Sequence, residues 1–122
     1  MKNSKYGNKK VKRDGMIFDS QREADRWTYL CQLMDAGVIT ELDRQVTFEL
    51  LPAQYELSTV GVRGGKDRGK CIERSVKYIA DFVYKDQLGR KVVEDTKGYK
   101  TPEYVLKRKM MLYIHGIRIK EV

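Results

Sequence analysis

Two β-rich runs joined by a short polar turn constrain the fold of this chain more than any other feature. The runs span residues 76–84 and 91–97, and Gly89 lies in the turn between them. Glycine can adopt the positive φ that short hairpin loops often require. The stretch from Tyr78 to Gly98 therefore predicts a β-hairpin, around which the rest of the chain is organised.

Acidic residues interrupt both arms of this hairpin. Because side chains alternate between the faces of a strand, Asp81 is expected to share a face with Ile79 and Val83. The opposite face would carry Tyr78, Ala80, Phe82 and Tyr84. An unpaired charge between two β-branched apolar residues is costly. Asp95 and Lys97 share a face of the second arm, so pairing would bring two carboxylates and one ammonium together.

These residues carry a resemblance to a known superfamily. Asp81, followed after the turn by Asp95-Thr96-Lys97, resembles the D…(D/E)xK signature of the PD-(D/E)XK nucleases, which have the restriction-endonuclease-like fold. The runs GMIFDSQREA, RQVTFEL, YIADFVY and VVEDTKG are similar to a family of small, uncharacterised phage-encoded proteins in that superfamily. The resemblance covers nearly the whole chain except about residues 54–75. No proline precedes Asp81, and Glu94 competes with Asp95 for the position of the second acid.

The remaining pattern predicts one α/β domain over residues 1–122, since the chain is long enough for a single core. Helix start and stop signals occur twice along the chain. The expected elements are a helix from Ser20 to Gly37, a strand from Gln45 to Leu51, the hairpin, a helix from Thr101 to Gly116, and a strand from Ile117 to Val122. This order, α-β-β-β-α-β, predicts a mixed central sheet flanked by helices, as the resemblance also implies.

Two basic segments lie outside these elements. Residues 1–13 are rich in Lys and Asn and are expected to form a mobile arm, either solvated or in contact with phosphates. Residues 54–75 are rich in Gly, Lys and Arg and are interpreted as a flexible insertion or as a basic flap. With 25 Lys and Arg against 17 Asp and Glu, the net charge of +8 favours a polyanionic partner.

Composition argues against several other classes of site. Cys31 and Cys71 are far apart and His115 is the single histidine, so a Cys/His zinc site is not expected. No apolar run reaches the roughly 18 residues of a membrane span. No secretory signal pattern is recognisable, so we expect a cytoplasmic protein without membrane contact or small-molecule cofactor.

The resemblance implies a catalytic centre that holds Mg²⁺ or Mn²⁺. Asp81, Asp95 and the backbone carbonyl of Thr96 would be the metal ligands, and Lys97 would stabilise developing negative charge. Glu23 has two interpretations, as a helix cap only or as an additional acid of the catalytic site. DNA-backbone contacts are expected from a larger basic set, for which a solvated surface is the alternative: Arg63, Lys66, Arg68, Lys70, Lys100, Lys107 and Arg108.

The sequence thus leads to an expected function and to rivals. We expect a metal-dependent DNA endonuclease, acting in phage DNA metabolism in the bacterial host on branched DNA such as a Holliday junction. Because one small chain carries one site, cleavage of both strands would most simply need a homodimer. The alternatives are a non-catalytic basic DNA-binding or packaging accessory protein, and an RNA-directed nuclease.

Overall fold

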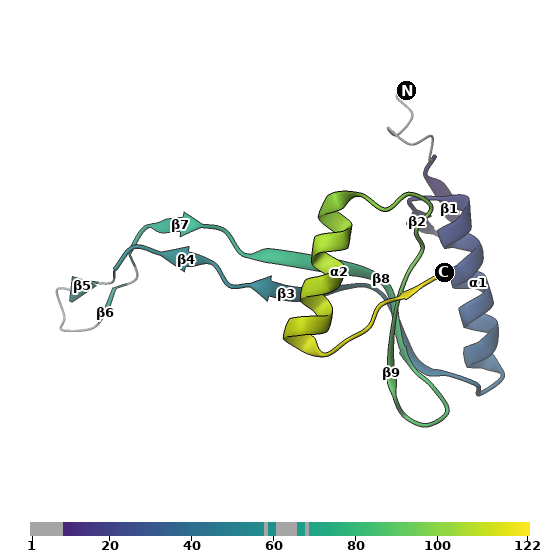
Figure 1. The fold of residues 1–122 in the computed structure, drawn as a ribbon. Helices are drawn as coiled ribbons and strands as arrows, with labels where there is room; N and C mark the ends of the chain where they lie inside the picture. The colour runs from purple at the N-terminus through teal and green to yellow at the C-terminus, as the bar shows by residue number, and fades with distance from the viewer. Residues whose placement is uncertain (1–8, 58, 61–65, 68) are drawn as a thin grey trace.

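A computed structural model describes residues 9–57, 59–60, 66–67 and 69–122 of the chain (Figure 1). Its main sheet is four-stranded, in the order β10-β9-β8-β3. The strands are β3 (Thr40–Leu51), β8 (Val76–Lys85), β9 (Lys91–Asp95) and β10 (Lys120–Glu121). The β3–β8 and β8–β9 pairs are antiparallel, whereas β10 pairs in parallel with β9. The predicted α/β class with a mixed sheet is confirmed.

Two helices accompany the sheet, α1 (Gln21–Asp35) and α2 (Pro102–His115). The hydroxyl of Ser20 accepts a hydrogen bond from the amide of Glu23, and α1 is followed by Gly37 at φ 75°. Thr101 caps α2 in the same way, and Gly116 ends it at φ 67°. Both pairs of helix signals in the sequence are therefore confirmed, as is the positive φ of Gly89 in the β8–β9 turn.

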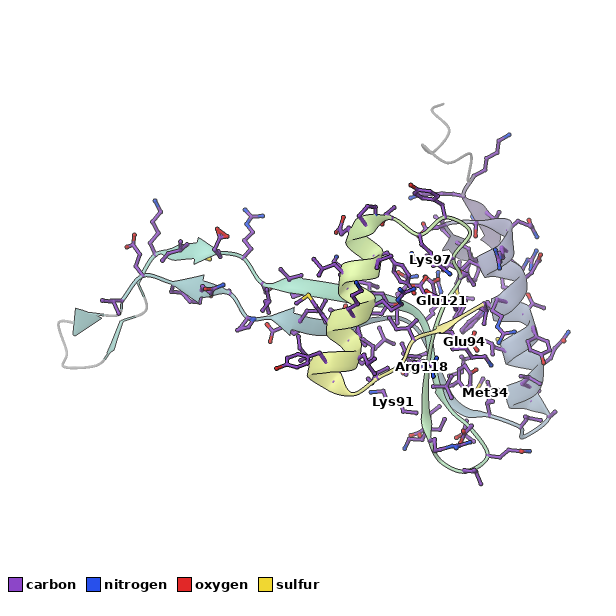
Figure 2. All side chains as sticks on the ribbon, viewed as in Figure 1. Met34, Lys91, Glu94, Lys97, Arg118 and Glu121 are labelled. Atoms are coloured by element: carbon purple, nitrogen blue, oxygen red, sulfur yellow. The ribbon has the colours of Figure 1, made fainter. Side chains whose placement is uncertain are left out.

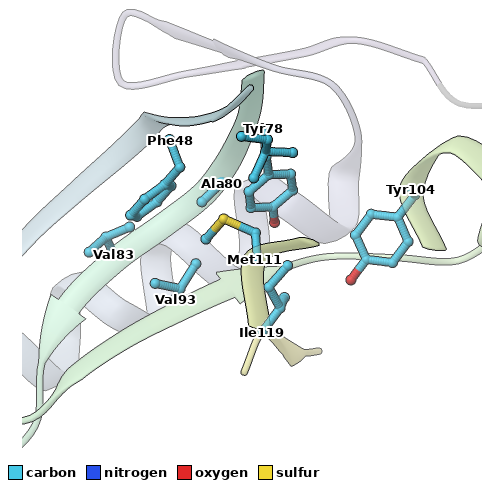
Figure 3. Packing of buried hydrophobic residues seen from close by; sticks show 9 residues of the cluster. Phe48, Tyr78, Ala80, Val83, Val93, Tyr104, Met111 and Ile119 are labelled. Carbon is cyan, nitrogen blue, oxygen red and sulfur yellow. The ribbon is translucent and has the colours of Figure 1, made fainter. Parts of the chain in front are cut away.

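Each helix packs against its own apolar cluster. The cluster beside α2 comprises Phe48, Leu50, Tyr78, Ala80, Val83, Val93, Tyr104, Met111 and Ile119 (Figure 3). The cluster beside α1 comprises Leu30, Ile39, Phe82 and Tyr84. Phe82 and Val83 are consecutive in one strand yet belong to different clusters, so α1 and α2 cover opposite faces of the sheet.

The alternation of side chains along β8 reverses at Asp81, which corrects the predicted faces. Tyr78 and Ala80 pack in the α2 cluster, whereas Phe82 packs in the α1 cluster. Ile79 is 54% exposed, so Asp81 does not lie between two buried apolar residues as expected. Opposite this point on β3 lies Gln45, which has φ 56°. Such local irregularities change the direction in which side chains point, and this one lies opposite Asp81.

A two-stranded ribbon extends β3 and β8 beyond α2 (Figure 1). It contains β4 (Gln54–Tyr55) paired with β7 (Cys71–Glu73), and β5 (Thr59–Val60) paired with β6 (Lys66–Asp67). At Gly69 a Cβ atom would lie 2.7 Å from the carbonyl oxygen of Glu56, so the two chains approach closely there. Where the structure describes it, the expected insertion is a paired β-ribbon. Residues 58, 61–65 and 68 lie outside the described part.

The chain ends also differ from expectation. Strand β1 (Val11–Arg13) pairs with β2 (Met16–Phe18) through a turn at Asp14-Gly15, where both residues have positive φ. The expected basic arm therefore does not extend to residue 13, and residues 1–8 lie outside the described part. The predicted last strand is shorter than expected, since β10 contains two residues. The amide of Val122 donates to the carbonyl of Asp95 at 3.0 Å.

Candidate active site

A cleft opens where β8, β9 and the N-terminal ends of both helices meet. Its larger part encloses about 520 Å³ and its smaller part about 380 Å³. Both parts are lined by Asp19, Asp81, Lys97 and Thr101. The cleft therefore joins residues from the hairpin with residues that precede α1 and α2. It brings together the expected acidic and metal-binding residues and the expected lysine: Glu23, Asp81, Asp95, Thr96 and Lys97.

Asp81 is anchored from the neighbouring strand. Its Oδ2 accepts one hydrogen bond from the backbone amide of Thr96 at 2.8 Å and another from the Thr96 hydroxyl at 2.7 Å. Two donors on one oxygen fix the orientation of the carboxylate. Thr96, expected to contribute its carbonyl, is thus also the residue that positions Asp81.

Asp95 is almost completely buried, with 1% of its surface exposed. Its Oδ2 accepts a hydrogen bond from the Tyr78 hydroxyl at 2.5 Å. Its Oδ1 is buried and accepts no hydrogen bond within the described residues, although Lys97 Nζ lies 3.3 Å away. Burial and the charge of Asp81 raise the pKa of Asp95 to about 7, against the lowering effect of Tyr78 and Lys97. A buried carboxylate oxygen is costly unless a charge compensates it, and the Lys97 ammonium is the nearest cation to this oxygen.

The ammonium group of Lys97 has two close contacts. Its ammonium lies 3.3 Å from Asp95 Oδ1 and 4.6 Å from the centroid of the Tyr104 ring. A cation over an aromatic face is attracted by the ring quadrupole. The side chain is 30% exposed, so the ammonium remains accessible to a ligand in the cleft.

Glu23 has the helix-cap contact expected from the sequence and also lines the cleft. It is 2% exposed, lines the larger part of the cleft, and accepts from the Asp19 amide at 3.3 Å. Its other oxygen accepts from the Gln45 side-chain amide at 3.2 Å, and Arg44 lies 3.9 Å away. Burial, Asp81 and Asp19 raise the pKa of Glu23 to about 7. Glu23 therefore both fixes the backbone before α1 and contributes a carboxyl group to the cleft.

Glu94 faces away from the cleft, which distinguishes it from Asp95. Arg26 donates to its two oxygens at 2.8 and 2.7 Å, and the Tyr84 hydroxyl also donates to it. Glu94 is completely buried. The acidic doublet is thus divided between the two faces of the sheet, and only Asp95 lines the cleft.

The predicted phosphate-contacting residues are dispersed. Lys107 lines the smaller part of the cleft and pairs with Glu103 at 3.1 Å. Lys100 and Arg108 both pair with Glu121, at 3.2 and 3.1 Å. Lys70 lies in the distant ribbon, where Lys66 is described by its backbone alone. Arg63 and Arg68 lie outside the described residues.

The sequence did not identify Tyr78 and Arg22 as residues of the cleft. Tyr78 lines its smaller part, and simple alternation had placed this residue on the opposite face from Asp81. Arg22 lines the larger part and donates to the Lys97 carbonyl at 3.5 Å. Its position in the first turn of α1 was the available signal, because the neighbouring Glu23 was already a candidate.

The residues of the cleft fit a hard divalent cation. Magnesium prefers oxygen ligands and is often held by one or two carboxylates and several waters. Asp81 and Asp95 supply carboxylate oxygens of this kind, and the Oδ1 of Asp95 accepts no hydrogen bond from a described residue. Across residues 9–57, 59–60, 66–67 and 69–122, no three Asp, Glu, His or Cys side chains form a group that could hold a metal. The fit is therefore to a sparsely liganded ion and not to a protein cage.

The fold and the cleft define a small α/β protein with two aspartates and a lysine at one end of a mixed sheet. Residues 3–120 match the family described as protein of unknown function (DUF1064), and the chain belongs to that family. No curated protein and no solved structure matches the chain significantly. Neither helix in the described part of the chain is long and apolar enough to cross a membrane.

Proposed function

We propose that this protein is a divalent-metal-dependent DNA endonuclease of the PD-(D/E)XK type. The observation that carries the proposal is the buried Asp95 Oδ1, which accepts no hydrogen bond from any described residue and forms an ion pair with the Lys97 ammonium at 3.3 Å. Asp81 lines the same cleft. Two acids and a lysine at one polar cleft are suited to binding a cation and a phosphate together.

Each residue has a distinct role in this proposal. Asp81, Asp95 and the carbonyl of Thr96 would hold Mg²⁺ or Mn²⁺, which neutralises phosphate charge and acidifies water when bound. Lys97, whose ammonium group contacts Asp95 and Tyr104, would stabilise negative charge on the reacting phosphate. Glu23, whose pKa is about 7, can hold or release a proton near neutral pH.

The partner in this proposal is DNA. The net charge of +8 favours a polyanion, and Lys107 adds a cation to the wall of the cleft. A single cleft of this kind cuts one strand at a time, so a homodimer would place two clefts on one duplex or on a branched junction. Recombination intermediates in phage DNA metabolism, such as Holliday junctions, are the proposed substrates.

One observation favours the rival function, a basic DNA-binding or packaging protein without catalysis. Asp81 is held by Thr96, and Asp95 by Tyr78, so both acids have contacts that a purely structural role would also need. A non-catalytic protein of this kind would bind DNA but would not cut it, whichever metal ion is present. A cleavage assay separates the two functions directly.

The test incubates the protein with supercoiled plasmid, a four-way junction, a flap duplex and single-stranded RNA. Each substrate is combined with Mg²⁺, Mn²⁺ or chelator. Asp81→Asn is expected to lower metal-dependent cleavage by at least about two orders of magnitude, the scale lost with a key electrostatic group. Asp35→Asn is the matched control, since Asp35 is exposed at the end of α1.

Cleavage is compared with and without metal, and between the wild type and the two variants. DNA cleavage that requires metal, survives in Asp35→Asn and disappears in Asp81→Asn supports the proposal. Cleavage of RNA alone would replace the DNA substrate by RNA. If the folded wild type binds DNA but cuts none of these substrates with either metal, the nuclease function is wrong.

A further inference from the structure

A second polar cavity lies on the far flank of α2, separate from the cleft. It encloses about 400 Å³ between α2 and the segment that leads into β10. Its lining contains both basic and apolar side chains: Arg108, Lys109, Leu112, Arg118, Ile119 and Glu121. Figure 2 shows Arg118 and Glu121 on this C-terminal segment.

The single acid of this cavity is already compensated. Glu121 Oε2 accepts from Arg108 at 3.1 Å and from the Tyr104 hydroxyl at 2.8 Å. Its Oε1 pairs with Lys100 at 3.2 Å, and these contacts lower the pKa of Glu121 despite the opposing effect of burial. The charge of Glu121 is therefore already neutralised by Lys100 and Arg108, and it does not neutralise the other cations of the cavity.

Two cations of the cavity have no counter-ion among the described residues. Lys109 and Arg118 are exposed, and neither forms an ion pair or a hydrogen bond in the part of the chain that the structure describes. Most of the other basic residues near α2 do have acidic partners, as Lys107 has Glu103 and Arg108 has Glu121. The cavity thus has excess positive charge beside the apolar side chains of Leu112 and Ile119.

The position of the cavity connects it to the cleft. In the parallel β9–β10 pair, Glu121 is aligned with Asp95, so the two acids occupy neighbouring strands at the same level. Tyr104 links the two sites, since its ring contacts Lys97 and its hydroxyl donates to Glu121. Lys107 lines the cleft and the next residue of α2, Arg108, lines the cavity, so a polyanion in the cleft can extend across this turn of α2 toward Lys109 and Arg118.

We propose that Lys109 and Arg118 form a second binding site for backbone phosphates of the DNA whose scissile phosphate occupies the cleft. Guanidinium groups bind phosphate oxygens in a bidentate manner, and lysine adds a point charge. The site makes no contact with bases, so it contributes affinity and orientation but no sequence preference. The choice of DNA as ligand rests on the proposed function.

The test measures binding of a 30-base-pair duplex in chelator, so that no cleavage occurs, over a range of salt concentrations. The double variant Lys109→Gln/Arg118→Gln is compared with Lys85→Gln/Arg90→Gln, which removes the same charge. Lys85 and Arg90 lie near the β8–β9 turn, where they pair with Glu41 and Asp86. Loss of the phosphate contacts is expected to reduce the log–log salt slope by about 1–2 units, with little change in the control. Thermal melts of both variants establish that they are folded.

The binding measurement tests the phosphate site, and the cleavage assay tests the proposed nuclease function, so the two can fail independently. A reduced slope in the α2 variant supports the phosphate site, whether or not the wild type cuts DNA. A slope equal to that of the control variant overturns the site, even if the wild type is an active nuclease. Absence of DNA binding by the wild type overturns the site as well. Absence of metal-dependent cleavage alone overturns only the nuclease function.

Discussion

Arg26 and Glu94 form a bidentate ion pair between α1 and β9, on the face of the sheet that α1 covers. Arg26 Nε and Nη2 lie 2.8 and 2.7 Å from the two carboxylate oxygens. Glu94 is completely buried, and the next residue in the strand is Asp95. The pair therefore fixes the position of β9 at the residue before the cleft acid.

Removal of Arg26 should destabilise the protein strongly. Arg26→Met leaves the buried Glu94 with only the more distant Lys120 ammonium, at 3.9 Å, and the expected loss in the free energy of unfolding is about 3 kcal/mol. Urea denaturation measures this loss. Arg90→Met is the matched control, because Arg90 pairs with Asp86 at the surface and such pairs contribute about 1 kcal/mol or less. The double variant Arg26→Met/Glu94→Leu should recover much of the loss, and a double variant as unstable as the single one would contradict this account.

Tyr78→Phe should raise the pKa of Asp95 and lower the stability of the protein, although the substitution removes only one hydroxyl group. The hydroxyl of Tyr78 donates to Asp95 and lowers the pKa of that carboxyl. Its removal should raise the pKa of Asp95 and cost about 1.5–3 kcal/mol of stability at pH 8, where the carboxylate is charged. Tyr113→Phe is the control, since Tyr113 is 91% exposed. Equal stabilities of the two variants would show that the Tyr78 hydroxyl contributes nothing.

Stability without metal should fall as the pH rises from about 4 to about 8. In the folded protein the pKa values of Glu23 and Asp95 are both raised to about 7. Through this interval the folded state keeps protons that the unfolded state has lost, so the unfolded state binds fewer protons and the free energy of unfolding decreases. The decrease ends about one pH unit above the folded pKa values, where both groups are deprotonated in the folded state as well. Asp86 has a lowered pKa, so its contribution is lost below about pH 4, outside this interval.

Asp81→Asn should make this pH dependence shallower. The charge of Asp81 raises the pKa of both Glu23 and Asp95, and asparagine removes that charge. The amide oxygen can still accept from Thr96, so the fold should be retained. Urea denaturation in chelator at half-unit pH steps measures the effect, with Asp35→Asn as the control. A profile unchanged from wild type would show that the three acids are not electrostatically coupled.

Mg²⁺ should raise the melting temperature of the wild type more than that of Asp81→Asn. Binding to the folded state alone stabilises it by mass action. The increase should be larger at pH 8 than at pH 6, because Asp95 must lose its proton to act as a ligand. Differential scanning calorimetry in Mg²⁺ and in chelator measures both shifts. Equal shifts in the two proteins would place any bound metal elsewhere.

Local signals in the sequence predicted much of the fold. The helix caps at Ser20 and Thr101 depend on neighbouring residues only, and both are confirmed. The pairing of β8 with β9 also follows from a short loop that contains Gly89. The Asp14-Gly15 turn carried an equally local signal, since this dipeptide favours a tight hairpin, but it was not recognised.

The details of the candidate site depend on tertiary structure and could not be predicted in the same way. Strict alternation placed Tyr78 away from Asp81, whereas the irregular backbone at Gln45 reverses the faces there. The different environments of Glu94 and Asp95 depend on Arg26, which is 68 residues away from Glu94 in the sequence. Periodicity within one strand contains no information about such partners.

The ribbon that continues β3 and β8 gives the protein an elongated outline (Figure 1). A compact chain of 122 residues would have a radius of gyration of about 14 Å, and a projecting ribbon increases that radius without adding mass. An elongated shape raises the hydrodynamic radius at constant mass. A monomer of this form should therefore elute early from a size-exclusion column, at the position of a compact dimer. Only a method that measures mass directly, such as light scattering or sedimentation equilibrium, can therefore count the subunits of this protein.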